Sequence, residues 1–151
     1  LCGTSPTKLC HKKGYSEEWI NQRMKTIEMR KELTDEWQRS GVKQGKEYAI
    51  LTNEISQAWS GMTTKEYKNF KGLKKENLRD NMSNLELVLN MLAEVSTTEI
   101  SRGSNPQGFE ESKKVARQGG NVARNAREEI EKQSGKSAIT SKTAKDSDQI
   151  E

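Results

Sequence analysis

The chain has 151 residues, with 26 lysines and arginines against 22 aspartates and glutamates, which gives a formal net charge of +4. Leucine, isoleucine, valine and phenylalanine make up about 17% of it, below the roughly 20% at which disorder competes with folding. No run of residues approaches the ~18 apolar positions of a membrane helix, and no apolar signal segment follows the first residue. We therefore expect one small folded region with unfolded flanks, located in the cytoplasm and without a membrane partner.

Two helices are predicted in the first part of the chain. Apolar residues recur there at steps of three and four, which is the period of an amphipathic helix. Ser16 suits the N-cap of the first helix, and Gly41 suits its C-terminal end. The second helix is expected to run from Tyr48 to Gly61. The apolar positions that define the two helices are Trp19, Ile20, Met24, Ile27, Leu33, Trp37, Tyr48, Leu51, Ile55, Ala58 and Trp59.

Two capping boxes predict the starts of two further helices. Thr63 is followed three residues later by Glu66, and Ser83 is followed at the same spacing by Glu86. In this arrangement each side chain accepts a hydrogen bond from a free backbone N–H of the first turn. The second box opens the most apolar stretch of the chain, residues 85–95. We expect that helix to be buried on more than one side and to form the centre of the core.

The remaining segments complete a prediction of an all-α fold. A loop at 103–108 is followed by a helical pattern over 110–133. Serine, threonine, lysine and aspartate dominate residues 135–151, which we expect to be a disordered tail. The predicted architecture is a small bundle of about five helices over residues 14–134, after a flexible leader at 1–13.

No catalytic motif in the sequence is complete. The single histidine, His11, lies in the basic leader, and with Cys2 and Cys10 it supplies at most three of the four ligands of a structural zinc site. We therefore expect no enzyme activity, no metal, no cofactor and no small-molecule substrate. One alternative stays open, a metal-dependent hydrolase or nuclease that acts through scattered carboxylates such as Glu94 and Glu99.

Residues 63–79 form the one stretch whose pattern indicates a binding function. Lysines recur at steps of three and four, with aromatic residues between them, and such a basic helical face neutralises phosphates while aromatic rings stack on unpaired bases. The predicted nucleic-acid-binding residues are Lys65, Lys68, Lys71, Lys74, Lys75, Arg79, Tyr67 and Phe70. The alternative is a solvated helix whose Tyr67 and Phe70 point to the core.

A stripe of small residues lies in the last predicted helix. It consists of Ala116, Gly119, Gly120 and Ala123. Glycine costs about 1 kcal/mol relative to alanine inside a helix, so a glycine pair there indicates a close approach of another backbone or a kink. We expect these residues to make a helix contact. If that contact joins two chains, the alternative function is an oligomerisation or protein-interaction domain that never touches nucleic acid.

Five segments, in this order, make the sequence similar to a known family. They are LTDEWQRSGVKQGKEYAILTNEI (33–55), KGLKKENLRDNM (71–82), TTEI (97–100), QGFEE (107–111) and GGNVARNAREEIE (119–131). The succession resembles the C-terminal region of prophage antirepressor-like proteins of the BRO family, often labelled DNA-damage-inducible protein D. The segment KKGYSEEWINQRMK (12–25) is similar to the linker helix that precedes this region.

The resemblance implies a non-enzymatic regulator of transcription in a prophage or a DNA-damage response. Members carry an N-terminal Bro-N domain that is thought to bind DNA, and nothing in this chain matches it. Because the chain also begins with Leu1, we expect a piece of a larger regulator whose leader is unrelated sequence. The expected partners are nucleic acid, a protein or a second copy of the chain.

Overall fold

The computed structural model describes residues 14–143, and this part of the chain contains five α-helices, a single 3₁₀ turn and no strand. The predicted all-α fold of about five helices is therefore confirmed. The calls made on Cys2, Cys10, His11 and the leader lie outside the described residues. The elements are α2 (Glu17–Arg39), α3 (Lys46–Ser60), α4 (Thr64–Phe70), η1 (Arg79–Asn81), α5 (Asn84–Ser104) and α6 (Gly108–Ser134).

The ends of the helices follow the local chemistry of the sequence. The Ser16 hydroxyl accepts a hydrogen bond from the backbone N–H of Trp19 at 3.1 Å and so caps α2. Both predicted capping boxes are present, at the starts of α4 and α5. Gly61 ends α3 with φ of 80°, a left-handed conformation that only glycine adopts without strain.

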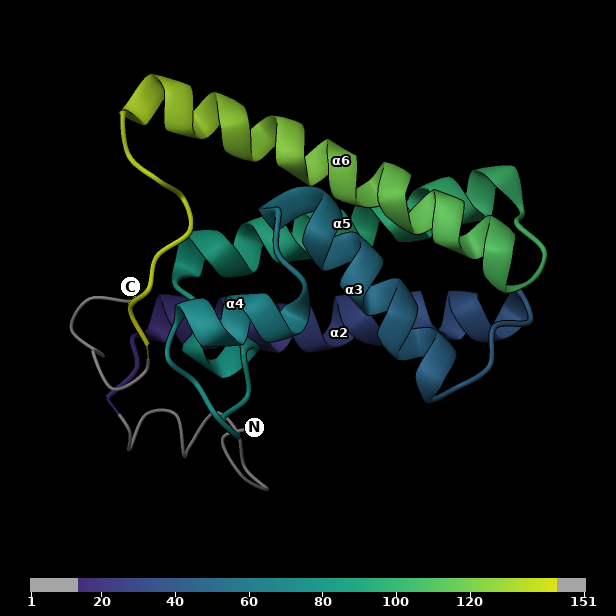
Figure 1. Cartoon of the computed structure of the whole chain (residues 1–151), viewed down its shortest axis with the longest axis horizontal. Helices are drawn as coiled ribbons and strands as arrows, with labels where there is room; N and C mark the ends of the chain where they lie inside the picture. Colours follow the sequence, from purple (N-terminus) through teal and green to yellow (C-terminus); the bar gives the residue numbers. More distant parts are fainter. Residues whose placement is uncertain (1–13, 144–151) are drawn as a thin grey trace.

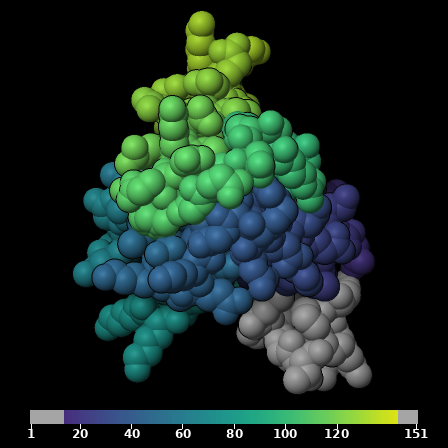
Figure 2. All heavy atoms as spheres, turned by 90° about the vertical axis from the view of Figure 1, so that its right-hand side faces the viewer, coloured from purple at the N-terminus to yellow at the C-terminus, as the bar shows by residue number. Residues whose placement is uncertain are grey.

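Helix α5 lies at the centre of the molecule, as the apolar stretch predicts. It packs against α2 on one side and α6 on the other, while α3 packs across α6 and the short α4 lies beside the start of α5 (Figure 1). Figure 2 shows the C-terminal turns of α6 projecting beyond the rest of the body. Among residues 14–143, no helix is long and apolar enough to cross a membrane. The largest fully buried side chains are Trp19, Trp37, Trp59, Tyr67, Ile20, Leu33, Leu51, Ile55, Met82, Leu87 and Leu89.

The small-residue stripe of α6 lies in a contact within the chain. A Cβ atom added to Gly119 would lie 2.6 Å from the backbone nitrogen of Thr97 in α5, and one added to Gly120 would lie 2.9 Å from the carbonyl oxygen of Ile55 in α3. Ala116 and Ala123, on the same stripe, are fully buried. The two glycines therefore let α6 approach α5 and α3 at backbone distance. This stripe is not an exposed surface for a second chain.

The segment after α6 differs from the predicted disordered tail. Residues 135–143 run from the free end of α6 back toward α4 and the start of α5 (Figure 1). Ala138 and Ile139 are buried in the core, and the prediction for residues 135–143 is corrected. The physical reason is a specific anchor, because the Lys71 ammonium donates to the carbonyl oxygens of Thr140 at 2.6 Å and Lys142 at 2.7 Å.

Candidate nucleic-acid interface

The helix that carries the predicted basic face ends earlier than the spacing of its lysines indicates. Helix α4 ends at Phe70, and Gly72 adopts φ of 72°, so the backbone turns before the later cations are reached. Lys74 and Lys75 therefore lie in the loop after α4, and Arg79 lies in the 3₁₀ turn. The predicted cations therefore do not lie on a single helical face, although Lys68 and Arg79 line one pocket.

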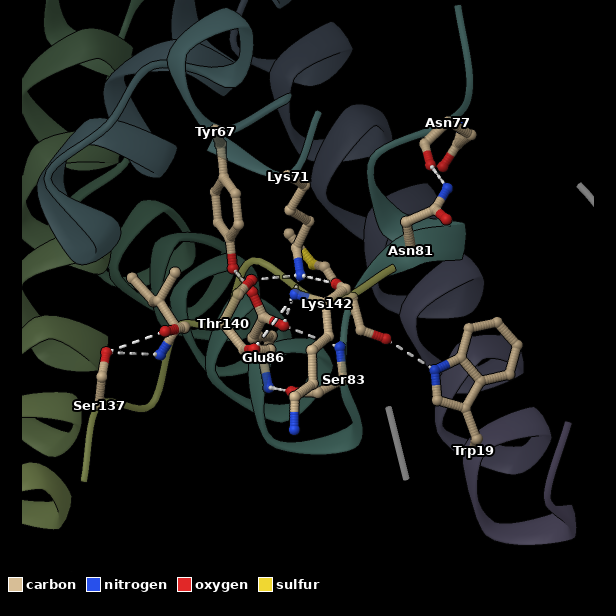
Figure 3. Close-up of polar contacts among 12 residues, drawn as sticks. Trp19, Tyr67, Lys71, Asn77, Asn81, Ser83, Glu86, Ser137, Thr140 and Lys142 are labelled. Carbon is tan, nitrogen blue, oxygen red and sulfur yellow. Dashed lines mark hydrogen bonds and ion pairs between the residues drawn. The ribbon is translucent and has the colours of Figure 1, made fainter. Parts of the chain in front are cut away.

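Two of the predicted contact residues are buried, and this part of the prediction is corrected. Tyr67 is fully buried and its hydroxyl donates to Glu86 (Figure 3). Lys71 donates to Glu86 Oε1 at 2.9 Å, and both side chains of this ion pair are 0% exposed. The Lys71 ammonium and the Tyr67 hydroxyl thus satisfy one buried carboxylate, which keeps both away from solvent and from any nucleic acid.

Burial changes the pKa of both groups. Desolvation, followed by the charge of Glu86 and its hydrogen bond, raises the pKa of Tyr67 far above its ordinary value. Desolvation lowers the pKa of Lys71, and the neighbouring carboxylate of Glu86 opposes that effect. The tyrosine therefore stays protonated and acts as a hydrogen-bond donor to the carboxylate.

The other six predicted residues do lie at the surface. Lys65, Lys74 and Lys75 are exposed, and Lys68 and Arg79 are partly exposed. We call these five cations the basic surface. Phe70, the remaining predicted residue, lies at the end of α4 and is 49% exposed.

The lysines of the basic surface are free of ion pairs. Within residues 14–143, none of its four lysines pairs with a carboxylate, and only Arg79 does. The two acids of the same segment bind backbone instead: Glu66 caps α4 by accepting from the N–H of Thr63, and Glu76 accepts from the N–H groups of Lys74 and Lys75. Hydrogen bonds from Thr63 lower the pKa of Glu66. With Arg79 paired to Glu94, the four lysines against these two carboxylates leave an excess of two positive charges.

A polar pocket of about 230 Å³ lies next to the basic surface and shares Lys68 and Arg79 with it. Glu94 on α5 is one of its lining residues, and Glu94 Oε2 accepts from Arg30 Nη1 and Arg79 Nη2, both at 2.9 Å. Arg30 also donates to the Thr52 hydroxyl and lies 5.1 Å from the ring centre of Trp37. Burial, with the like charge of Arg79, lowers the pKa of Arg30, while Glu94 opposes this.

Sequence patterns missed Arg30 and Asn90 as members of this pocket. A signal for Asn90 is present, because Asn90 and Glu94 are four residues apart within the most apolar helix and so share one face of it. No comparable signal marks Arg30, which lies on the charged side of the α2 pattern and approaches Glu94 only through the packing of α2 on α5.

The two carboxylates named for the hydrolase alternative, Glu94 and Glu99, do not lie in one site. Glu94 is 1% exposed and held by two arginines, whereas Glu99 is exposed and pairs with Arg102 at 3.0 Å. In the described part of the chain, no group of three or more metal-ligating side chains comes together. The two residues named for that alternative therefore do not form a common site.

Comparison with known families shows which family the chain matches. A family model described as the DinD C-terminal domain matches residues 15–147, which include all five helices, the basic surface and the polar pocket. Comparisons with curated proteins and with solved structures gave no match.

Proposed function

The chain belongs to the DinD C-terminal domain family, and we propose that it is a non-enzymatic regulatory module of a DNA-damage response that binds single-stranded nucleic acid through its basic surface. In this proposal the domain serves a regulator of the prophage antirepressor type. Binding is electrostatic and involves no covalent step.

The free lysines of the basic surface are the observation that carries the proposal. Every arginine of the described chain pairs with a carboxylate. Lysines without an ion pair also occur elsewhere in this part of the chain, as at Lys43, Lys114 and Lys132, but Lys65, Lys68, Lys74 and Lys75 lie within one short segment and concentrate positive charge there. Lysine is a compact point charge that contacts phosphate without reading a base, whereas arginine is the usual bidentate reader of guanine. The composition of the surface thus favours backbone contact with little sequence preference.

The exposed ring of Phe70 favours binding of single strands over binding of duplex. The ring is 49% exposed at the end of α4, next to the free lysines in the chain. An exposed ring offers a stacking platform for an unpaired base, a contact of roughly 1–3 kcal/mol per base in proteins that bind single strands. A base within a duplex is already stacked and gains nothing from the ring.

The proposal is tested by titrating the full chain into fluorescent single-stranded and duplex oligonucleotides. Releasing counterions at five cations gives a slope of roughly −3.5 in log affinity against log salt, so single-strand binding should weaken by roughly 100-fold between about 50 and 200 mM salt. The triple variant Lys65→Glu/Lys74→Glu/Lys75→Glu should abolish binding. Phe70→Ala should weaken single-strand binding and leave the weaker duplex binding unchanged.

A matched control separates the effect of this surface on binding from the effect of the net charge of the chain. Lys43→Glu/Lys114→Glu/Lys132→Glu changes the charge of the chain by the same amount at exposed positions outside α4 and the loop that follows it. That variant should retain most of the affinity. Equal losses in the two triple variants, or no binding at low salt, would refute the proposal. A stable dimer in light scattering without any binding would favour the oligomerisation function instead.

A further inference from the structure

The polar pocket beside the basic surface holds more positive charge than the protein neutralises. Its charged lining consists of Arg30, Lys68 and Arg79 against the single carboxylate of Glu94. Asp80, the acid that follows Arg79 in the sequence, is already paired with Arg23 at 2.9 Å. The two arginine side chains are only 23% and 22% exposed. Two positive charges thus lie in a partly desolvated site without a counter-ion, an arrangement that an anion would stabilise.

Two buried polar atoms of the pocket residues lack a hydrogen bond. Asn90, which is 6% exposed, has an unpartnered Nδ2 donor, and Glu94, which is 1% exposed, has an unpartnered Oε1 acceptor. Buried polar groups nearly always have a partner in folded proteins. The two residues lie one turn apart on α5 and both line the pocket. The free protein therefore offers a bound molecule one buried donor and one buried acceptor.

The charge and the hydrogen-bonding groups together define the ligand. A phosphate monoester carries about −1.5 to −2 charge and three acceptor oxygens, which matches the two excess cations and the Asn90 donor better than a carboxylate does. Arginine guanidinium groups suit phosphate oxygens in particular. The free acceptor on Glu94 requires a hydroxyl or an N–H on the same ligand. A volume of about 230 Å³, below the roughly 300–1,000 Å³ of pockets for larger ligands, limits the ligand to one phosphate and the group attached to it.

We infer that this pocket binds a phosphomonoester, with the phosphate on Arg79, Lys68 and Asn90 and a hydroxyl or N–H of the attached group donating to Glu94. Two sources present this chemistry, a free mononucleotide and the phosphorylated 5′ end of a DNA strand. The second source rests on the proposed function, because the basic surface would hold that strand. Binding of a free mononucleotide does not depend on the proposed function.

The inference is tested by calorimetric titration of the full chain with deoxyadenosine 5′-monophosphate, deoxyadenosine and inorganic phosphate. The monophosphate should bind, the nucleoside should not, and inorganic phosphate should bind more weakly than the monophosphate. Arg79→Gln should weaken binding by about tenfold or more, as expected for a lost charge-assisted contact. Arg124→Gln, at an exposed arginine of α6, is the matched control and should bind as the wild type does.

Asn90→Leu separates a ligand-binding role from a structural one. The side chain of Asn90 makes no hydrogen bond with the described residues, so an apolar side chain of the same shape should leave the melting temperature unchanged or raise it. The same substitution removes a phosphate donor and should weaken monophosphate binding severalfold. Unchanged affinity in both Asn90→Leu and Arg79→Gln, or equal binding of nucleoside and monophosphate, would overturn the inference.

Paired oligonucleotides distinguish the two sources. If the pocket takes a strand end, a 5′-phosphorylated single strand should bind more tightly than the same strand with a 5′-hydroxyl, and Asn90→Leu should remove the difference. If the monophosphate binds but the two strands bind alike, the free nucleotide is the ligand. Salt-dependent binding of the 5′-hydroxyl strand tests the basic surface separately, so the two proposals can fail independently.

Discussion

Replacing Gly119 with alanine tests how closely α6 approaches α5. The added methyl group would lie 2.6 Å from the backbone nitrogen and 2.7 Å from the Cα of Thr97. These are main-chain atoms inside a helix, so the close contact is relieved only if the two helices move apart. Overpacking of this kind costs about 3 kcal/mol at the upper end of its usual range. Alanine recovers about 1 kcal/mol through its better helix propensity, and a net loss of about 2 kcal/mol remains.

Thermal and urea unfolding of the full chain measure this loss. A net loss of that size should lower the melting temperature by about 6 °C. The matched control is Gly103→Ala in α5, where an added methyl group meets no atom within 4 Å. It keeps the propensity gain and should be neutral or stabilising by up to about 1 kcal/mol. If Gly119→Ala melts at or above the wild-type temperature, the close approach of α6 to α5 is wrong.

The buried ion pair gives two further predictions. Lys71→Met should lower the free energy of unfolding by about 3–5 kcal/mol, because Glu86 would stay buried without its cation, while Lys65→Met on the exposed side of α4 should change it by less than about 0.5 kcal/mol in the same urea titration. The pKa of Tyr67 is raised from its ordinary value of 10.0, so above that pH only the unfolded chain loses the phenolic proton. The wild type should therefore lose stability relative to Tyr67→Phe, by up to about 1.4 kcal/mol per pH unit, in unfolding titrations from about pH 9 to 11. A parallel pH dependence of the two proteins would contradict the burial of Tyr67.

The helices were predictable from the sequence because their signals are local. Period and capping boxes depend on residues within one or two turns, and both predicted boxes are present in the structure. Lys71 is buried because it pairs with Glu86, which is fifteen residues away in sequence. Its spacing is the same as that of the exposed lysines, so periodicity alone places all of them on one solvated face. Only the packing of α4 on α5 separates them.

The polar pocket shows a second limit of sequence reasoning. Arg30 and Arg79 are 49 residues apart in the chain and share one oxygen of Glu94. Helical spacing assigns each of them to the outside of its own element. The tail shows the same limit, because residues 135–143 are polar in composition but are held by one buried ammonium group.

The position of Glu86 has a consequence for how the domain opens. Its carboxylate accepts from the backbone N–H of Ser83 and from Tyr67 and Lys71, and Lys71 in turn holds the carbonyl oxygens of residues 140 and 142 (Figure 3). Local openings in proteins tend to follow such shared contacts and release whole segments at once. We therefore expect helix α4, the first turn of α5 and the segment after α6 to open as one cooperative unit, so that their amide hydrogens exchange with solvent together although they belong to three separate stretches of the chain.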